Sequence, residues 1–108
     1  MMYHVKISSQ AETDLRDIYE YIAFELQAPE NAAGQIDRLQ KTILGLDHMP
    51  KRFRCYEKEP WKSRGLREVP VDNYLVFYIP DDSTETVTII RVMYGGRDVD
   101  TQLNKSIK

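Results

Sequence analysis

The spacing of apolar residues changes twice along this chain, and the order of those changes is the strongest constraint on its fold. Between residues 3 and 7 apolar and polar side chains alternate, which is typical of a strand with one buried face. Residues 11–46 then repeat apolar residues every three or four positions, the period of an amphipathic helix. Three further strand-like segments follow before residue 95. The predicted order of elements is therefore β-α-α-β-β-β.

The helical stretch is predicted to form a pair of helices. Ser9 and Glu12 have the spacing of a capping box, in which both side chains satisfy free amides of a first turn, so a helix is expected to begin near Ser9. Pro29 interrupts the apolar pattern and suits the first turn of a second helix. Pro50 disfavours helical geometry at the residue before it and ends the second helix. The short joint predicts an antiparallel hairpin.

The three later segments are predicted to form a meander of strands. They cover residues 65–71, 73–79 and 85–94, and turn residues separate them at 72–73 and 80–83. We therefore expect a single α+β domain over residues 1–108. It should have two layers, an antiparallel four-stranded sheet and an N-terminal helical hairpin on one face. The other face of the sheet is expected to stay uncovered and to hold any functional site.

The composition narrows the class of protein. The chain carries a formal net charge of -2, but residues 51–70 contain seven basic and three acidic side chains. No apolar run approaches the roughly 20 residues of a membrane span, and the first residues do not resemble a secretory signal, so we predict a cytoplasmic protein without membrane contact. One cysteine and two isolated histidines give no metal-ligand spacing. We predict no metal site and no cofactor.

The basic stretch KRFRCYEKEPWKSR, residues 51–64, is predicted to be a long loop. It places Trp61 among Lys58, Lys62 and Arg64. An exposed indole beside cations can stack on a base or anchor a protein partner. The alternative is that Trp61 covers the edge of the core and that the charges are simply solvated.

Three arginines and a tyrosine in the strands are further candidates. Arg67 either pairs with a carboxylate or presents its donors to a phosphate on the uncovered face. Arg91 lies in an apolar run, which favours a structural ion pair. Arg97 follows two glycines and marks either a turn or the rim of a site. Tyr94 is a core aromatic or a phenol that faces a ligand, and regular alternation along the strand favours the core.

Four segments, AETDLRDIYEYIAFEL, LDHMP, GLREVPVDNYLVFYIPDD and VTIIRVMYGGRD, occur in this order over almost the whole chain. In this arrangement the sequence resembles the RelE/ParE family of bacterial type II toxin–antitoxin toxins. The resemblance implies a curved sheet with a helical hairpin, a role in growth inhibition or plasmid stabilisation, and neutralisation by a cognate antitoxin. We expect the antitoxin to cover the open face of the sheet.

The family contains two kinds of toxin, and the resemblance points to different residues for each. For a ribosome-dependent mRNA endonuclease, it implies Arg67, Arg97 and Lys62 as catalytic cations and Glu59 as the base. Against this, the places of an expected Arg and an expected Tyr hold Leu75 and Leu103, and the histidine near the chain end has no counterpart.

The ending RVMYGGRD is closer to the ParE-like branch, whose members inhibit DNA gyrase by binding it. We therefore predict a gyrase-binding toxin, with Lys58, Trp61, Arg64 and Tyr94 as candidate binding residues and no small-molecule substrate. The alternative is an mRNA interferase that acts on ribosome-bound message. A third possibility is a degenerate family member that binds an antitoxin without being toxic.

Overall fold

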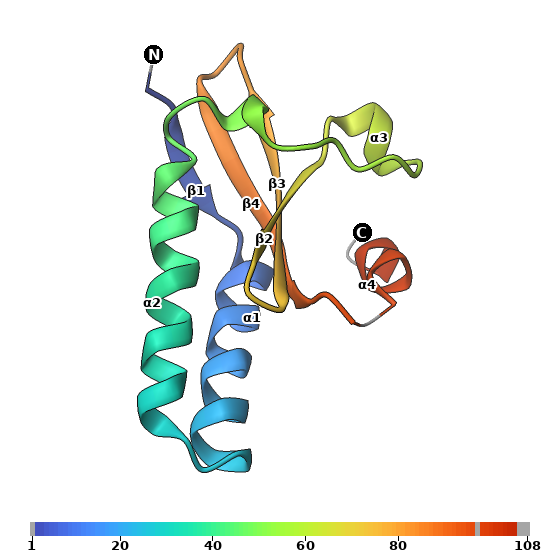
Figure 1. Ribbon diagram of the computed structural model, residues 1–108. Coiled ribbons are helices and arrows are strands. Elements are labelled where there is room, and N and C mark those ends of the chain that lie inside the picture. The colour runs from blue at the N-terminus through green and yellow to red at the C-terminus, as the bar shows by residue number, and fades with distance from the viewer. Residues whose placement is uncertain (1, 97, 106–108) are drawn as a thin grey trace.

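The computed structural model describes residues 2–96 and 98–105, and Figure 1 shows the arrangement of their elements. The helices and strands are β1 (His4–Ile7), α1 (Ser9–Glu20), a π-helical turn η1 (Tyr21–Glu25), α2 (Pro29–Gly45), a 3-10 turn η2 (Pro50–Arg52), α3 (Trp61–Arg64), β2 (Arg67–Val71), β3 (Tyr74–Asp81), β4 (Thr86–Tyr94) and α4 (Val99–Lys105). The predicted order is confirmed, with two short helices added.

The helical hairpin forms as predicted, but its first cap lies one residue earlier. Ser8 has extended backbone geometry, and its hydroxyl oxygen accepts a hydrogen bond from the Ala11 amide at 3.0 Å. Ser9 is already helical, so the expected capping box from Ser9 is wrong. α1 continues into the π-helical turn before the chain reverses, and Pro29 is in the first turn of α2 as expected.

The sheet is mixed, with strand order β1-β4-β3-β2. The strands β2, β3 and β4 pair antiparallel, as predicted for a meander, whereas β1 pairs parallel with β4. The expectation of a purely antiparallel sheet is wrong for this one strand. Tight turns set the direction of β3 and β4, but β1 is joined to the rest of the sheet through two helices, so a hairpin turn cannot impose an antiparallel direction on it.

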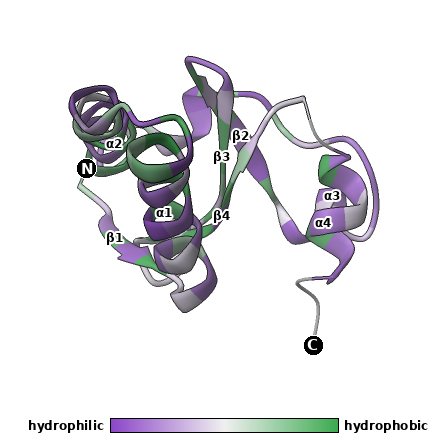
Figure 2. Ribbon diagram, turned by 90° about the horizontal axis from the view of Figure 1, so that it is seen from below, coloured by the Kyte–Doolittle hydropathy of each residue, from purple (hydrophilic) through white to green (hydrophobic). Residues whose placement is uncertain are grey.

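The main core lies between the helical hairpin and one face of the sheet, which we call the helix face (Figures 1 and 2). Strand parity places alternate apolar residues of β2, β3 and β4 on this face. The fully buried members from the sheet and helices include Ala11, Leu39, Ile43, Leu46, Val76, Tyr78, Val87 and Ile89. Their burial explains the helical and strand periods read in the sequence.

The opposite face of the sheet, here the far face, is not left uncovered as we expected. The segment from Tyr56 to Leu66, with α3, and the C-terminal α4 lie on this side of the sheet (Figure 2). A second buried cluster forms beneath them, made of Tyr56, Trp61, Leu66, Phe77, Met93 and Leu103. Phe77 and Leu103 expose none of their surface. This small second core removes most of the surface on which we had placed a site.

A bulge interrupts the pairing of β3 with β4. Phe77 is opposite Arg91, but the next residue, Tyr78, is opposite Ile89, so Ile90 has no direct partner. A bulge shifts the alternation of the strand by one residue. After it, Tyr94 is paired with Tyr74, which packs against the helix-face core. Tyr94 is therefore on the helix face, as is Val92, but 48% of its surface is exposed, so the core placement favoured from the sequence was wrong.

Candidate functional site

The loop before β2 is held against the outer edge of that strand. The Tyr56 amide donates to the carbonyl of Leu66 at 2.9 Å, and the Glu68 amide donates to that of Arg54 at 3.1 Å. Arg54 also forms an ion pair with Glu68, with an Nη2–Oε1 distance of 2.5 Å. The Glu68 side chain is 8% exposed and that of Arg54 is 80% exposed, so the pair fixes the loop while one guanidinium still faces solvent. The loop is therefore more ordered than its composition suggested.

Trp61 is buried beneath this loop and is not available to a ligand. Only 3% of its surface is exposed, and its indole N–H donates to Oδ1 of Asn104 in α4 at 3.3 Å. A second hydrogen bond joins the Tyr56 hydroxyl to Oδ1 of Asp100 at 2.9 Å. Burial and the bond to Asp100 raise the pKa of Tyr56 to about 12. Both contacts hold α4 on the far face, so the core alternative for Trp61 is the correct one.

Glu59 acts as a cap for α3. Its two carboxylate oxygens accept hydrogen bonds from the amide and the hydroxyl of Ser63, at 3.0 and 2.9 Å. These bonds hold the pKa of Glu59 below its usual range. A general base works best with a pKa near the working pH. Glu59 therefore has the contacts of a structural cap, not those of a base raised toward neutrality.

The remaining cations of this loop are on the surface. Lys58, Lys62 and Arg64 are exposed, and among the described residues no ion pair involves them. The guanidinium of Arg64 lies over the Trp61 ring, 5.3 Å from its centroid. We call these three residues the cationic strip. They are solvated charges that a partner of opposite charge can reach.

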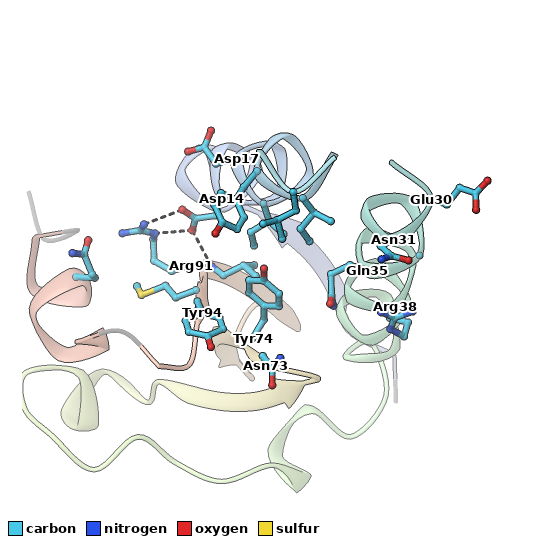
Figure 3. A pocket seen from close by; sticks show the side chains of 18 residues that line it. Asp14, Asp17, Glu30, Asn31, Gln35, Arg38, Asn73, Tyr74, Arg91 and Tyr94 are labelled. Atoms are coloured by element: carbon cyan, nitrogen blue, oxygen red, sulfur yellow. Dashed lines mark hydrogen bonds and ion pairs between the residues drawn. The ribbon is translucent and has the colours of Figure 1, made fainter. Parts of the chain in front are cut away.

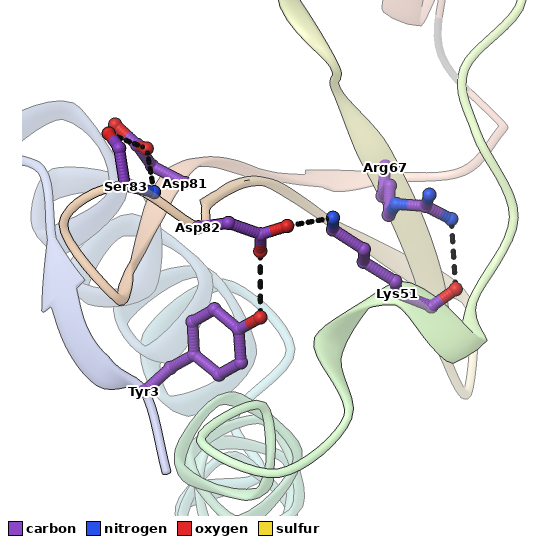
Figure 4. Close-up of polar contacts among 6 residues, drawn as sticks. All are labelled: Tyr3, Lys51, Arg67, Asp81, Asp82 and Ser83. Carbon is purple, nitrogen blue, oxygen red and sulfur yellow. Dashed lines mark hydrogen bonds and ion pairs between the residues drawn. The ribbon is translucent and has the colours of Figure 1, made fainter. Parts of the chain in front are cut away.

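Arg67 lies on the helix face and not on the face where we had placed a site. In the register of β2 and β3 it is opposite Tyr78, whose side chain is in the helix-face core. Its Nη1 donates to the carbonyl of Phe53 at 2.6 Å and to that of Lys51 at 3.0 Å, the second of which Figure 4 shows. Lys51 in turn pairs with Asp82, which also accepts a hydrogen bond from the Tyr3 hydroxyl at 2.7 Å. Arg67 thus anchors the chain around η2, and the placement expected from the sequence is corrected.

Arg97 lies outside the described residues. Its neighbour Asp98 caps α4, because its carboxylate accepts bonds from the hydroxyl and the amide of Thr101 at 2.7 and 3.3 Å. The bonds from Thr101 also lower the pKa of Asp98. The two glycines before Arg97 lie in a crowded turn. A Cβ on Gly96 would come within 2.6 Å of the Tyr94 ring, and one on Gly95 within 3.3 Å of the Asn73 carbonyl oxygen. Neither glycine has a left-handed backbone.

A groove opens where the helical hairpin extends past the end of the sheet (Figure 3). Its volume is about 980 Å³, and residues of α1, η1, α2, β3 and β4 contribute to its walls. The apolar part is formed by Ile18, Ile22, Leu26, Tyr74, Val92 and Tyr94. Of the described candidates from the sequence, Arg91 and Tyr94 lie here. Tyr94 has 48% of its surface exposed, and its ring is edge-on to that of Tyr74, with the ring centroids 5.8 Å apart.

An ion pair forms one wall of this groove. Asp14 accepts two bonds from the Arg91 guanidinium, from Nε to Oδ2 at 2.7 Å and from Nη2 to Oδ1 at 2.9 Å. Oδ2 also accepts the Val92 amide at 2.9 Å, at an edge of β4 that extends beyond the last residue of β1. The predicted structural pair of Arg91 is confirmed. Its partner was not predicted, because it lies 77 residues away.

No motif in the sequence predicted this groove, because its residues come from separate helices and strands that only folding brings together. One signal in the sequence was available. Apolar residues continue to Tyr21 and Leu26 at the end of the first helix of the hairpin, where they remain 54% and 56% exposed. In the described residues we find no group of metal-ligating side chains, and no helix there is long and apolar enough to cross a membrane.

The helical hairpin and the mixed sheet, with a groove and a cationic strip on the surface, define a small α+β domain of the RelE/ParE fold. Three solved structures share this fold. The chromosomal ParDE system of P. aeruginosa aligns with a TM-score of 0.70 and 19% identity over 86% of this chain and 96% of that one. A free mutant of the E. coli toxin RelE gives 0.68 and 16%, with both chains fully covered. The RelBE2 complex of Mycobacterium tuberculosis gives 0.63 and 22%, over 87% and 99%.

The family model described as "ParE toxin of type II toxin-antitoxin system, parDE" matches residues 5–99. The chain belongs to this family, and it is a toxin of a type II toxin–antitoxin system. No curated protein matches the sequence. α4 lies almost entirely beyond the matched residues.

Proposed function

We propose that this toxin acts in the cytoplasm by binding DNA gyrase, and not by cutting RNA. The observation that carries the proposal is that two of the expected nuclease residues, Arg67 and Glu59, lie on opposite sides of the sheet. Arg67 is bonded to two backbone carbonyls on the helix face, and Glu59 is bonded to Ser63 on the other side of the sheet. General acid–base catalysis needs its groups within hydrogen-bond reach of the same substrate atoms.

The cationic strip is the surface that we assign to the target. Lys58 lies just before α3, and Lys62 and Arg64 lie in it; all three are exposed. The segment that carries them is held to β2 by the Arg54–Glu68 pair and by backbone bonds on either side of α3. Gyrase works while bound to DNA, so its working surfaces lie in a negative field that attracts such a strip. Charged residues at the rim of an interface act chiefly on the association rate and on its salt dependence.

The test is a supercoiling assay with purified gyrase and relaxed plasmid. We expect the toxin to inhibit supercoiling, and we expect Lys58→Glu/Lys62→Glu to weaken inhibition by about tenfold at low salt, because each reversed charge turns an attraction of up to about 1 kcal/mol into repulsion. A matched control, Lys6→Glu/Lys41→Glu, makes the same charge change at exposed positions outside the strip. It should inhibit like the wild type.

Unchanged supercoiling at micromolar toxin would reject gyrase as the target. Primer extension on ribosome-bound message, run beside it, tests the alternative of an mRNA interferase. Glu59→Gln and Lys62→Ala are better probes of cleavage than Arg67→Ala, because loss of Arg67 also removes two bonds that hold the chain around η2. New cuts that disappear in those two variants would favour the nuclease.

A further inference from the structure

The helix α4 is attached to the far face through side chains. Leu103 is fully buried in the second core, the Tyr56 hydroxyl donates to Asp100 at 2.9 Å, and the Trp61 indole donates to Asn104 at 3.3 Å. The helix has seven residues. Isolated helices shorter than about 12–15 residues are marginal in water, so α4 keeps its helix only while it is docked.

The sheet beneath α4 is complete without it. The last turn of β4 is fixed before α4 begins, because the Gly95 amide donates to the Asn73 carbonyl at 2.8 Å. Elements with few buried contacts open locally while the rest of a fold stays intact. Departure of α4 would uncover the cluster that contains Trp61, Phe77 and Met93. The far face would then have an apolar centre with the cationic strip beside it, which is the anatomy of a protein interface.

The contacts of α4 indicate which segment fits this surface. Two donors of the second core, the Tyr56 hydroxyl and the Trp61 indole, are satisfied by acceptors on Asp100 and Asn104. Leu103 fills the space between sheet and loop. Positions i, i+3 and i+4 share one face of a helix, and a buried donor left without an acceptor is costly. A replacement for α4 is therefore a helix with a leucine and two oxygen acceptors at the same spacing.

The charge around α4 favours an acidic occupant. Bonds from Thr101 lower the pKa of Asp98, and the positive charges of Lys58 and Lys105 lower it further. The first residue of the cationic strip thus already acts on an acidic side chain beside α4. The other two, Lys62 and Arg64, form no ion pair within the part of the chain that the structure describes. A longer helix with carboxylates on its outer side would satisfy them as well.

We propose that α4 occupies the docking site of a helix of the target, and that this helix, acidic and bearing a leucine, displaces α4 from the far face. α3 and α4 lie together on the side of the sheet opposite to α1 and α2 (Figure 2). The surface and the chemistry of its occupant follow from this chain. The assignment of the occupant to gyrase rests on the proposed function.

The first test is hydrogen–deuterium exchange of the full-length toxin, alone and bound to purified gyrase. We expect the amides of α4, residues 99–105, to lose protection in the complex, because a displaced helix of this length unfolds. The loop that carries the cationic strip should gain protection. Higher protection of α4 in the complex would overturn the proposal, because α4 would then be part of the interface or remain beneath it.

The second test is the dissociation constant for gyrase, measured by surface plasmon resonance. Leu103→Ala weakens the closed state, so it should tighten binding by about tenfold, the factor by which closure reduces the fraction of competent toxin. Asn104→Ala, which removes one hydrogen bond, should act in the same direction with a smaller effect. The matched control is Leu44→Ala, the same change at a leucine of α2 that is 63% exposed. It should leave the affinity within about twofold.

Unchanged or weaker binding by both α4 variants, with their circular dichroism like that of the wild type, would overturn the proposal. Sedimentation of the toxin alone tests another occupant, the α4 of a second copy. A wild-type dimer that Leu103→Ala dissociates would overturn it too. If the toxin binds gyrase and α4 stays protected, this proposal fails and the proposed function stands. If the toxin does not bind gyrase at all, both fail.

Discussion

Replacement of Asp14 by alanine should be the most damaging single change to a polar residue in the helix–sheet interface. The carboxylate accepts a two-pronged contact from Arg91 and a third bond from the Val92 amide, and the Asp14 and Arg91 side chains are only 12% and 18% exposed. Asp14→Ala takes away the counter-ion of a largely buried guanidinium and the acceptor of a backbone donor. Breaking a buried pair from one side costs about 3–5 kcal/mol.

The free energy of unfolding of a small domain is typically about 5–15 kcal/mol, so such a loss removes a large part of it. In urea, with a slope of about 1–3 kcal/mol per molar, the midpoint should fall by roughly 2 M. Asp14→Asn keeps an oxygen that can accept the Val92 amide. Its loss of stability should therefore be smaller than that of Asp14→Ala by about 1 kcal/mol, the net value of one hydrogen bond. The control Asp37→Ala breaks an exposed pair with Lys41 and should cost under about 0.5 kcal/mol.

The double variant Asp14→Ala/Arg91→Met separates the charge from the packing. It should be more stable than Asp14→Ala alone, because an apolar side chain replaces a guanidinium that had lost its carboxylate. An unfolding midpoint of Asp14→Ala close to that of Asp37→Ala would contradict this prediction. A double variant that is less stable than Asp14→Ala alone would contradict it as well.

Two further measurements test the far-face cover and the buried phenols. The pKa values of Tyr56 and Tyr78 are raised to about 12, whereas phenols in the unfolded chain ionise near pH 10. Their contribution to stability should therefore be complete below pH 10 and should be lost between pH 10 and 12. Tyrosinate absorbance that rises fully near pH 10 in the folded protein would contradict this. Trp61 is the one tryptophan of the chain and reports on the cover by α4. Leu103→Asp should detach α4, shift the Trp61 emission to longer wavelength and make acrylamide quenching easier. An unchanged Trp61 spectrum would show that α4 does not cover this side chain.

Local sequence signals predicted most of the fold because they act over a few residues. The alternation of β2 to β4, the turn at Asp72 and the proline at the start of α2 each reflect short-range backbone geometry. The direction of β1 and the bulge at Ile90 do not. The direction of β1 depends on how it meets β4, about 80 residues later in the chain. The bulge lies between β3 and β4, and it changes which side chains of β4 share a face with Tyr94.

The candidate site was predicted less well, for a similar reason. Basic and aromatic residues in one loop suggested an exposed surface, and Lys58, Lys62 and Arg64 are indeed exposed. Trp61 was open to two interpretations because its burial depends on α4, which approaches from 40 residues further along the chain. Nothing near Arg67 in sequence indicated that it would bind the carbonyls of Lys51 and Phe53.

The sequence by itself determined the order of the elements, the helical hairpin, the meander and the toxin family, because periodicity, prolines and motifs are written into neighbouring residues. Only the tertiary structure decided which charges are already satisfied and which remain for a partner. Asp14 and Asp17 are both acidic residues of α1, three positions apart. Packing against β4 joins the first to Arg91, while the second is exposed at the edge of the groove and has no such ion pair among the described residues.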